Sequence, residues 1–192
     1  MQELKDRIIA EGRVLPGNII KVDGFLNHRI DTTLMNHIAE EFGKLFDMNE
    51  VSVILTAEAS GIALSAVVAQ HFGKPMIFAK KAKSDNIEGG LYRSDIYSYT
   101  YKKKVTLLVA KEWLSAEDKV LIIDDFMANG EAMRGLIDIV TAAGATLVGI
   151  GCAVEKGFQG GGDRLRAAGM NLKSLAIIES AEPGNIVFRE EQ

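Results

Sequence analysis

Residues 120–132 read Val-Leu-Ile-Ile-Asp-Asp-Phe-Met-Ala-Asn-Gly-Glu-Ala. Four apolar residues lead directly into two neighbouring carboxylates, Asp124 and Asp125, and a short turn with one glycine then precedes a helical pattern. An uninterrupted apolar run bounded by turn residues is typical of a strand buried on both faces of a parallel sheet. We therefore expect Asp124 and Asp125 at the carboxyl end of a central strand, where open α/β sheets bind their ligands.

The turn after these acids predicts a phosphate site. The first N–H groups of a helix have no partner within the helix and attract anions, and a glycine lets the backbone approach closely. Carboxylates accept hydrogen bonds from sugar hydroxyls, so the combination suits a ribose 5-phosphate. The alternative is an ordinary strand end followed by a plain helix start, which the pairing of two acids with a glycine turn disfavours.

The rest of the chain alternates between strand and helix patterns. Helix patterns cover residues 4–9 before Gly12, 31–45 with Asp31 as N-cap, 63–71, 133–140 and the surroundings of Leu165; strand patterns cover residues 51–55, 75–79, 120–123, 147–154 and 175–178. This alternation predicts an α/β fold with a mostly parallel central sheet and helices on both faces. Residues 19–22 are interpreted as an extended piece and Phe25–Leu26 as a loop.

Residues 80–104 interrupt this alternation. They contain several lysines, a Gly-Gly pair and the alternating run Ile96-Tyr97-Ser98-Tyr99, which predicts a flexible loop and a β-hairpin. We find no linker, repeat or low-complexity segment, so we expect a single domain over residues 1–192.

Composition and charge exclude several classes of function. The 192 residues are 47% hydrophobic with a net charge of -4, and the absence of a basic block argues against nucleic-acid binding. Neither a signal-peptide pattern nor an apolar stretch of bilayer length is present, so no membrane association is expected. The single cysteine, Cys152, excludes an intrachain disulfide, is interpreted as a buried structural thiol, and favours a cytoplasmic location.

Other candidate positions are weaker on their own. Residues 56–62, Thr-Ala-Glu-Ala-Ser-Gly-Ile, repeat the order strand, turn and helix, which is equally typical of an ordinary βα loop. Lys80, Lys81 and Lys156 each follow a strand, where lysines are usually solvated. The amide of Asn27 offers both a donor and an acceptor.

The histidines and the tryptophan suggest no further site. The spacing of these residues matches neither a metal-ligand motif nor a catalytic triad, so core or surface roles are expected for His28, His37, His71 and Trp113. We accordingly predict no metal ion held by protein ligands alone.

The stretch 120–132 resembles the 5-phosphoribosyl-1-diphosphate (PRPP) signature of the type I phosphoribosyltransferase family. Three further segments resemble the xanthine subfamily: Phe25-Leu26-Asn27-His28, Glu58-Ala59-Ser60-Gly61-Ile62 and Glu155-Lys156-Gly157-Phe158-Gln159. The similarity in length and motif order extends over nearly the whole chain. It implies the type I fold, with a small hood built from residues 1–30 and about 155–192.

The resemblance also implies roles for individual residues. Catalysis is assigned to Asp124 and Asp125 through the ribose hydroxyls; PRPP binding to Ala128, Asn129, Gly130, Glu131, Ala132, Ala59, Ser60, Gly61 and Lys81; xanthine binding to Ile20, Asn27, Lys156 and Phe158. The phosphate loop departs from the common family pattern, which has hydroxyl residues at positions 129 and 132. Because a carboxylate repels phosphate, we expect the Glu131 side chain to point to solvent.

The implied reaction transfers the 5-phosphoribosyl group from PRPP to xanthine in purine salvage, with guanine or hypoxanthine as alternative bases. Mg²⁺ is expected to enter with PRPP and to be held mainly by it. A homodimer is expected because Lys81 and the segment around it, residues 80–104, are suited to completing a neighbour's site. The competing interpretation is a PRPP- or purine-sensing regulator of the same fold, which the absence of a helix-turn-helix pattern disfavours.

Overall fold

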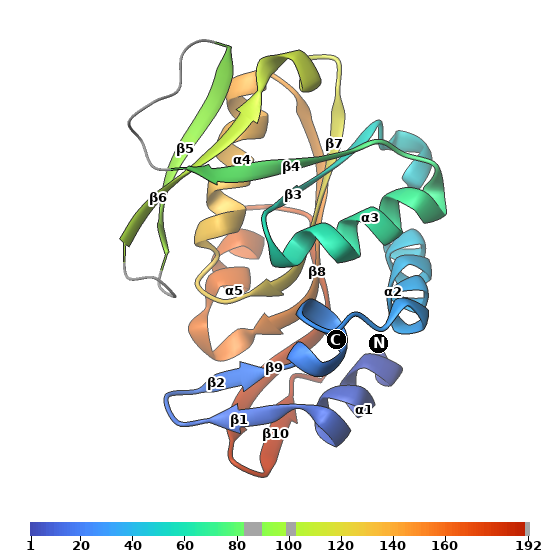
Figure 1. Cartoon of the computed structure of the whole chain (residues 1–192), viewed down its shortest axis with the longest axis vertical. Helices are drawn as coiled ribbons and strands as arrows, with labels where there is room; N and C mark the ends of the chain where they lie inside the picture. The colour runs from blue at the N-terminus through green and yellow to red at the C-terminus, as the bar shows by residue number, and fades with distance from the viewer. Residues whose placement is uncertain (83–89, 99–102, 191–192) are drawn as a thin grey trace.

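The computed structural model describes residues 1–82, 90–98 and 103–190 (Figure 1). These residues form a central sheet with the strand order β10-β9-β8-β7-β3-β4-β6-β5. The strands are β3 (Val53–Ala57), β4 (Met76–Ala82), β5 (Leu91–Ser98), β6 (Lys103–Ala110), β7 (Lys119–Met127), β8 (Thr146–Lys156), β9 (Leu172–Glu182) and β10 (Asn185–Phe188).

The middle of the sheet is parallel and its edges are antiparallel. Strands β9, β8, β7, β3 and β4 run in the same direction, whereas β10 pairs antiparallel with β9, and β6 pairs antiparallel with both β4 and β5. The predicted mostly parallel sheet is therefore confirmed, and β5 pairs with β6, which extends beyond residues 80–104, where a hairpin was expected. Because parallel strands end at the same edge of the sheet, the loops after β3, β7 and β8 are neighbours.

Helices cover both faces of the sheet (Figure 1). The helices are α1 (Gln2–Glu11), α2 (Thr32–Leu45), α3 (Ser60–Phe72), α4 (Glu131–Ala143) and α5 (Gly161–Ala167). The buried apolar side chains form two clusters, which we call the two cores. Helices α2 and α3 contribute to one core, and α4 contributes to the other. Among the described residues, no helix combines the length and the apolar character needed to cross a bilayer.

Strand β7 explains why the sheet needs cover on both faces. Leu121 and Ile123 belong to the core under α2 and α3, and Val120 and Ile122 belong to the core under α4. Successive side chains of a strand point to opposite faces of the sheet. All four side chains are fully buried, so both faces of β7 are covered. The interpretation of residues 120–123 as a strand buried on both faces is confirmed.

The N-terminal elements pack next to the C-terminal strands (Figure 1). Helix α1 ends at Gly12, as predicted, and β1 (Arg13–Leu15) pairs with β2 (Ile19–Lys21) in a separate two-stranded sheet. The predicted N-cap is also confirmed, since Asp31 accepts hydrogen bonds from the N–H groups of Thr33 and Leu34 (both 3.1 Å), which satisfies otherwise unpaired donors of α2.

Some expected boundaries were wrong. Phe25 and Leu26 lie in a one-turn π-helix (Asp23–Asn27) and are fully buried, so this segment is not an open loop. Strand β4 continues through Lys80 and Lys81 to Ala82, and β6 and β10 were not predicted. Within the expected flexible loop, residues 83–89 and 99–102 lie outside the described residues.

Candidate active site

Asp124 and Asp125 lie in the second half of β7, with 6% and 1% of their surface exposed. The N–H of Asp125 donates to Asp124 Oδ1 (3.0 Å), and Asn27 Nδ2 donates to Asp125 Oδ2 (2.9 Å). The remaining oxygen, Asp125 Oδ1, is buried without a hydrogen-bond partner among the described residues. Buried polar atoms are normally paired, so this oxygen is an acceptor available to a ligand.

The electrostatics of this pair are unfavourable in the free protein. Burial raises the pKa of the Asp124 carboxyl well above its usual range, and the negative charge of Asp125 raises this pKa further. The positive charge of Lys81 acts in the opposite direction. Two adjacent carboxylates in a poorly solvated position repel each other, and perturbed groups of this kind are common at functional sites.

The loop between β3 and α3 lies directly beside Asp124. At Gly61, which is buried, an added Cβ would lie 2.4 Å from Asp124 Oδ1 and 2.2 Å from Thr56 Oγ1, so only glycine permits this approach. Ala59 and Ser60 are exposed at the start of α3. The structure therefore brings Gly61, one of the three predicted residues of this loop, to the carboxylate pair.

Thr56 was not predicted as a site residue. It is fully buried at the end of β3, and Thr56 Oγ1 has no hydrogen-bond partner within the described part of the chain. The only signal in the sequence was a hydroxyl residue at the carboxyl end of a buried strand. That pattern is too common to single out one threonine.

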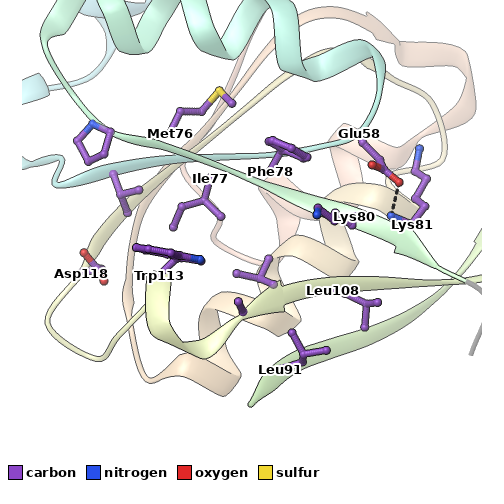
Figure 2. Close-up of a pocket in the computed structure, with 14 residues that line it drawn as sticks. Glu58, Met76, Ile77, Phe78, Lys80, Lys81, Leu91, Leu108, Trp113 and Asp118 are labelled. Atoms are coloured by element: carbon purple, nitrogen blue, oxygen red, sulfur yellow. Dashed lines mark hydrogen bonds between the residues drawn. The ribbon is translucent and has the colours of Figure 1, made fainter. Parts of the chain in front are cut away.

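Lys81 is joined to the same loop through its backbone. Its N–H donates to Glu58 Oε1 (2.5 Å), as Figure 2 shows. Its side chain is exposed, and its charge acts on Asp124 of the same chain. Lys81 therefore lies within electrostatic reach of its own site.

The loop after β7 has the geometry of an anion cradle. Residues 128–130 form a bend, Gly130 adopts a φ of 80°, and α4 begins at Glu131. No hydrogen bond from the N–H groups of residues 129–132 is found among the described residues. Unpaired N–H groups at a helix start, together with the helix dipole, favour a bound phosphate.

The Glu131 side chain lies at the surface in a pair that was not predicted. It accepts hydrogen bonds from Arg134 Nη2 (3.1 Å) and from the N–H of Tyr97 (3.4 Å). The side chain is 31% exposed. Pairing with Arg134 offsets the charge that would otherwise repel an anion.

The candidate base-binding residues are only partly brought together. Lys156 Nζ donates to the Asn18 carbonyl (3.2 Å) and lies 5.4 Å from the centroid of the Phe126 ring. Partial burial lowers the pKa of the Lys156 ammonium. Asn27 lies against Asp125, whose chain neighbour is Phe126.

The other two candidates lie in less direct positions. Ile20 is buried in the core under α2, and Phe158 packs against that core. Phe126, which was not predicted, is the aromatic residue that Lys156 contacts. Its position immediately after the two acids was a signal that sequence reasoning overlooked.

A family model for the phosphoribosyl transferase domain matches residues 25–167. The chain belongs to the phosphoribosyltransferase family, as the resemblance implied. Its relatives include the xanthine phosphoribosyltransferase of Bifidobacterium longum (strain NCC 2705), which is 54% identical over 98% of this chain and 100% of the relative. That of Lachnoclostridium phytofermentans is 52% identical over 98% of each chain.

Solved structures support the fold. The adenine phosphoribosyltransferase of Giardia lamblia, complexed with 9-deazaadenine, matches with a TM-score of 0.77 and 21% identity over 93% of this chain and 98% of that chain. The enzyme of Rhodothermus marinus matches with a TM-score of 0.73 and 19% identity over 93% and 100%. The type I phosphoribosyltransferase fold predicted from the sequence is confirmed.

The buried carboxylate pair generates a prediction about stability. The folded state binds the Asp124 proton more tightly than the unfolded state, so stability falls as the pH rises above the ordinary carboxyl pKa of 3.8. Asp124→Asn should therefore make the ligand-free protein more stable near neutral pH, by an amount on the order of 1 kcal/mol. Near pH 4 the difference should become small.

Urea unfolding of parent and variant at both pH values measures this difference. Asp6→Asn, which neutralises an exposed carboxylate on α1, is the control and should show no such gain. A variant that is less stable than the parent at neutral pH would contradict the account of the pair.

Proposed function

We propose that this chain transfers the 5-phosphoribosyl group from PRPP to xanthine, giving xanthosine 5′-monophosphate and pyrophosphate. The observation that carries this proposal is the buried carboxylate pair of β7, flanked by the loops after β3 and β7. The full-length similarity to xanthine phosphoribosyltransferases supports the choice of base. The reaction belongs to purine salvage.

The two loops and the carboxylate pair each bind a different part of PRPP. The ribose hydroxyls donate to Asp124 and Asp125, and the N–H groups of residues 128–132 hold the 5-phosphate. The N–H groups of residues 59–61, together with the Lys81 ammonium, hold the pyrophosphate. Each group therefore meets a part of PRPP with complementary charge or hydrogen-bonding capacity.

In the reaction, the bond between the anomeric carbon and the pyrophosphate oxygen breaks, a bond to a purine nitrogen forms, and the proton of that nitrogen leaves to solvent or to the released pyrophosphate. The anomeric carbon gains positive character as pyrophosphate leaves. The carboxylates of Asp124 and Asp125 stabilise this charge from the ribose side. Catalysis thus relies on positioning and electrostatic stabilisation.

The site suits Mg²⁺ carried in by PRPP. Asp125 Oδ1 is a buried hard oxygen without a partner among the described residues, and Mg²⁺ typically combines one or two carboxylates with phosphate oxygens. Three metal-ligating side chains do not converge within the described part of the chain, so PRPP would supply most of the ligands. The ion would neutralise charge on the leaving pyrophosphate.

The purine base is bound by residues from both ends of the chain. The Lys156 ammonium donates to the 6-oxo group, and the Asn27 amide serves another edge of the purine. Ile20 and Phe158 supply apolar walls. Residues 1–30 and about 155–192 thus act as a hood over the base within a single domain, and the one reduced cysteine supports a cytoplasmic location.

The role of Lys156 is tested with separate purine substrates. An ammonium can only donate, so it favours an acceptor oxygen at position six over the amino group of adenine. Lys156→Met should lower kcat/KM for xanthine roughly ten- to a hundredfold, since a hydrogen bond from a charged group is worth about 1.5–3 kcal/mol. The KM for PRPP should change little, and Asn27→Ala should have a smaller effect on xanthine use.

Lys173→Met is the matched control, because Lys173 is an exposed cation at the start of β9, away from the carboxyl ends of the strands. It should retain parental kinetics. If Lys156→Met leaves the preference among xanthine, guanine and adenine unchanged, Lys156 does not read the base. A parent chain that converts no purine with PRPP would overturn the proposed function.

We also propose that the active form is a homodimer. An apolar groove of about 780 Å³ lies over β4 and β6 (Figure 2). It is lined by Met76, Ile77, Phe78, Leu91, Leu108 and Trp113, among others. Phe78 and Trp113 are 36% and 65% exposed, which is unusual for large apolar side chains in one patch.

The position of this groove favours a second copy of the chain as its occupant. Glu58 and Lys81 also line it, so it borders the loop proposed to bind pyrophosphate. A second copy seated there would shield the apolar surface and would lie beside Lys81. The groove therefore links assembly to the site.

Trp113→Glu tests this surface, because a carboxylate placed there would have to be buried on association. We expect sedimentation velocity to show a dimer for the parent and mainly monomer for the variant. Ile9→Glu changes an exposed apolar residue on α1 (61% exposed) outside the groove and should remain dimeric. A fully active monomeric parent would remove the homodimer proposal.

A further inference from the structure

The rear of the phosphate loop (residues 128–132) is packed against the start of α5. At Gly161, an added Cβ would lie 2.3 Å from the Ala128 carbonyl oxygen and 2.8 Å from the Gly130 nitrogen. These contacts are with backbone atoms, which cannot move without moving the loop. The close approach of α5 therefore requires glycine at this position.

Arg164 is the side chain of α5 that contacts this loop. Its Nη2 donates to the Asn129 carbonyl oxygen (3.1 Å), and its Nη1 donates to the Gln159 carbonyl oxygen (3.5 Å). The Asn129 carbonyl and the Gly130 N–H belong to one planar trans peptide unit, so they point in opposite directions. A guanidinium that holds the carbonyl on one side therefore turns the Gly130 N–H to the other side.

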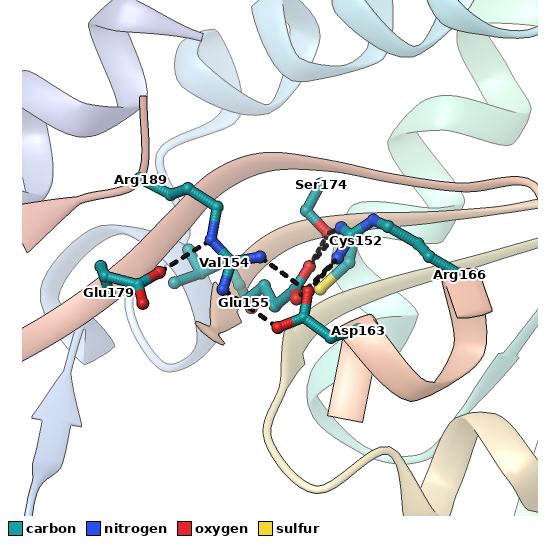
Figure 3. Close-up of polar contacts among 8 residues, drawn as sticks. All are labelled: Cys152, Val154, Glu155, Asp163, Arg166, Ser174, Glu179 and Arg189. Atoms are coloured by element: carbon teal, nitrogen blue, oxygen red, sulfur yellow. Dashed lines mark hydrogen bonds and ion pairs between the residues drawn. The ribbon is translucent and has the colours of Figure 1, made fainter. Parts of the chain in front are cut away.

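Helix α5 is itself firmly attached to the sheet. It has seven residues, too few to be stable without tertiary contacts. Arg166 forms a bidentate ion pair with Glu155, which is fully buried on β8 (Nη1–Oε1 3.0 Å, Nη2–Oε2 2.6 Å; Figure 3). Asp163 pairs with Arg189 near the C-terminus (2.6 Å).

The two arginines of α5, Arg164 and Arg166, have different contacts. Arg166 holds α5 in place, because loss of its guanidinium would leave the buried Glu155 charge unpaired. Arg164 makes no contact with the Glu155 pair among the described residues and reaches the loop instead. Substitution of Arg164 should therefore change the loop without releasing the helix.

We propose that Arg164 is a positioning residue for the 5-phosphate, holding the Asn129 carbonyl so that the loop N–H groups face the ligand. This proposal rests on the proposed function, in which residues 128–132 bind the 5-phosphate. Arg164 stabilises the geometry of the loop before PRPP arrives. A preorganised loop binds more tightly because less ordering remains to be done on binding.

Calorimetric titration with ribose 5-phosphate and, separately, with pyrophosphate tests this role. Arg164→Gln should weaken ribose 5-phosphate binding about tenfold, as expected for loss of one hydrogen bond from a charged donor, with pyrophosphate binding unchanged. In steady-state assays the KM for PRPP should rise more than kcat falls. Arg164→Lys, which retains a charged donor, should restore much of the loss.

Two further variants separate geometry from charge and folding. Gly161→Ala should also weaken ribose 5-phosphate binding, because the added methyl group displaces the loop from behind. Lys173→Gln, which removes a cation at the opposite end of the sheet, should bind both ligands as the parent does. Arg164→Gln should keep the unfolding temperature of the parent.

Equal ribose 5-phosphate affinity in parent and Arg164→Gln would overturn the proposal. Equal weakening of both ligands with a lowered unfolding temperature would also overturn it, since Arg164 would then be merely structural. A parent that binds neither ligand would instead overturn the proposed function. Selective loss of ribose 5-phosphate binding, reversed by lysine, supports the positioning role.

Discussion

Two neighbouring carboxylates are buried at the carboxyl end of β7, and much of the surrounding structure is organised around them. Burial and mutual repulsion raise the pKa of Asp124, so the pair lowers the stability of the free protein near neutral pH. A ligand that presents hydroxyl groups, or a cation, relieves this repulsion. In the proposed function, the same feature that is unfavourable in the free protein would favour binding of a ribose and developing positive charge on its ring.

Parallel strand geometry brings the other groups to this pair. Because β3, β7 and β8 end at one edge of the sheet, the segments that follow them lie on the same side as Asp124 and Asp125. Glycine at position 61 lets the β3 loop approach Asp124, and glycine at position 161 lets α5 support the β7 loop. The N-terminal residues complete the site through the hydrogen bond from Asn27 to Asp125.

The central sheet and the carboxylate pair could be predicted from the sequence, because their signals are local. An apolar run, two acids and a glycine turn are adjacent in the chain, and β7 forms as expected. The π-helix at Phe25 and Leu26 could not be predicted, since its burial depends on packing against distant elements. The contact from Arg164 to Asn129 spans 35 residues and has no local pattern.

Side-chain partners were also harder to predict than strand positions. Glu131 was expected to point to solvent, and its side chain lies at the surface, where Arg134 and the Tyr97 N–H hold its carboxylate. Arg134 follows Glu131 at a spacing that favours pairing on a helix, so the ion pair between these two residues could have been predicted from the sequence. The Tyr97 contact arises only because β5 packs against α4.

The rate of phosphoribosyl transfer by Asp124→Asn/Asp125→Asn shows whether the carboxylate pair serves the ribose. The double substitution preserves size and removes both charges, so turnover with PRPP and xanthine should collapse while circular dichroism and cooperative unfolding remain intact. Turnover within a few-fold of the parent would show that the carboxylate pair does not serve the ribose.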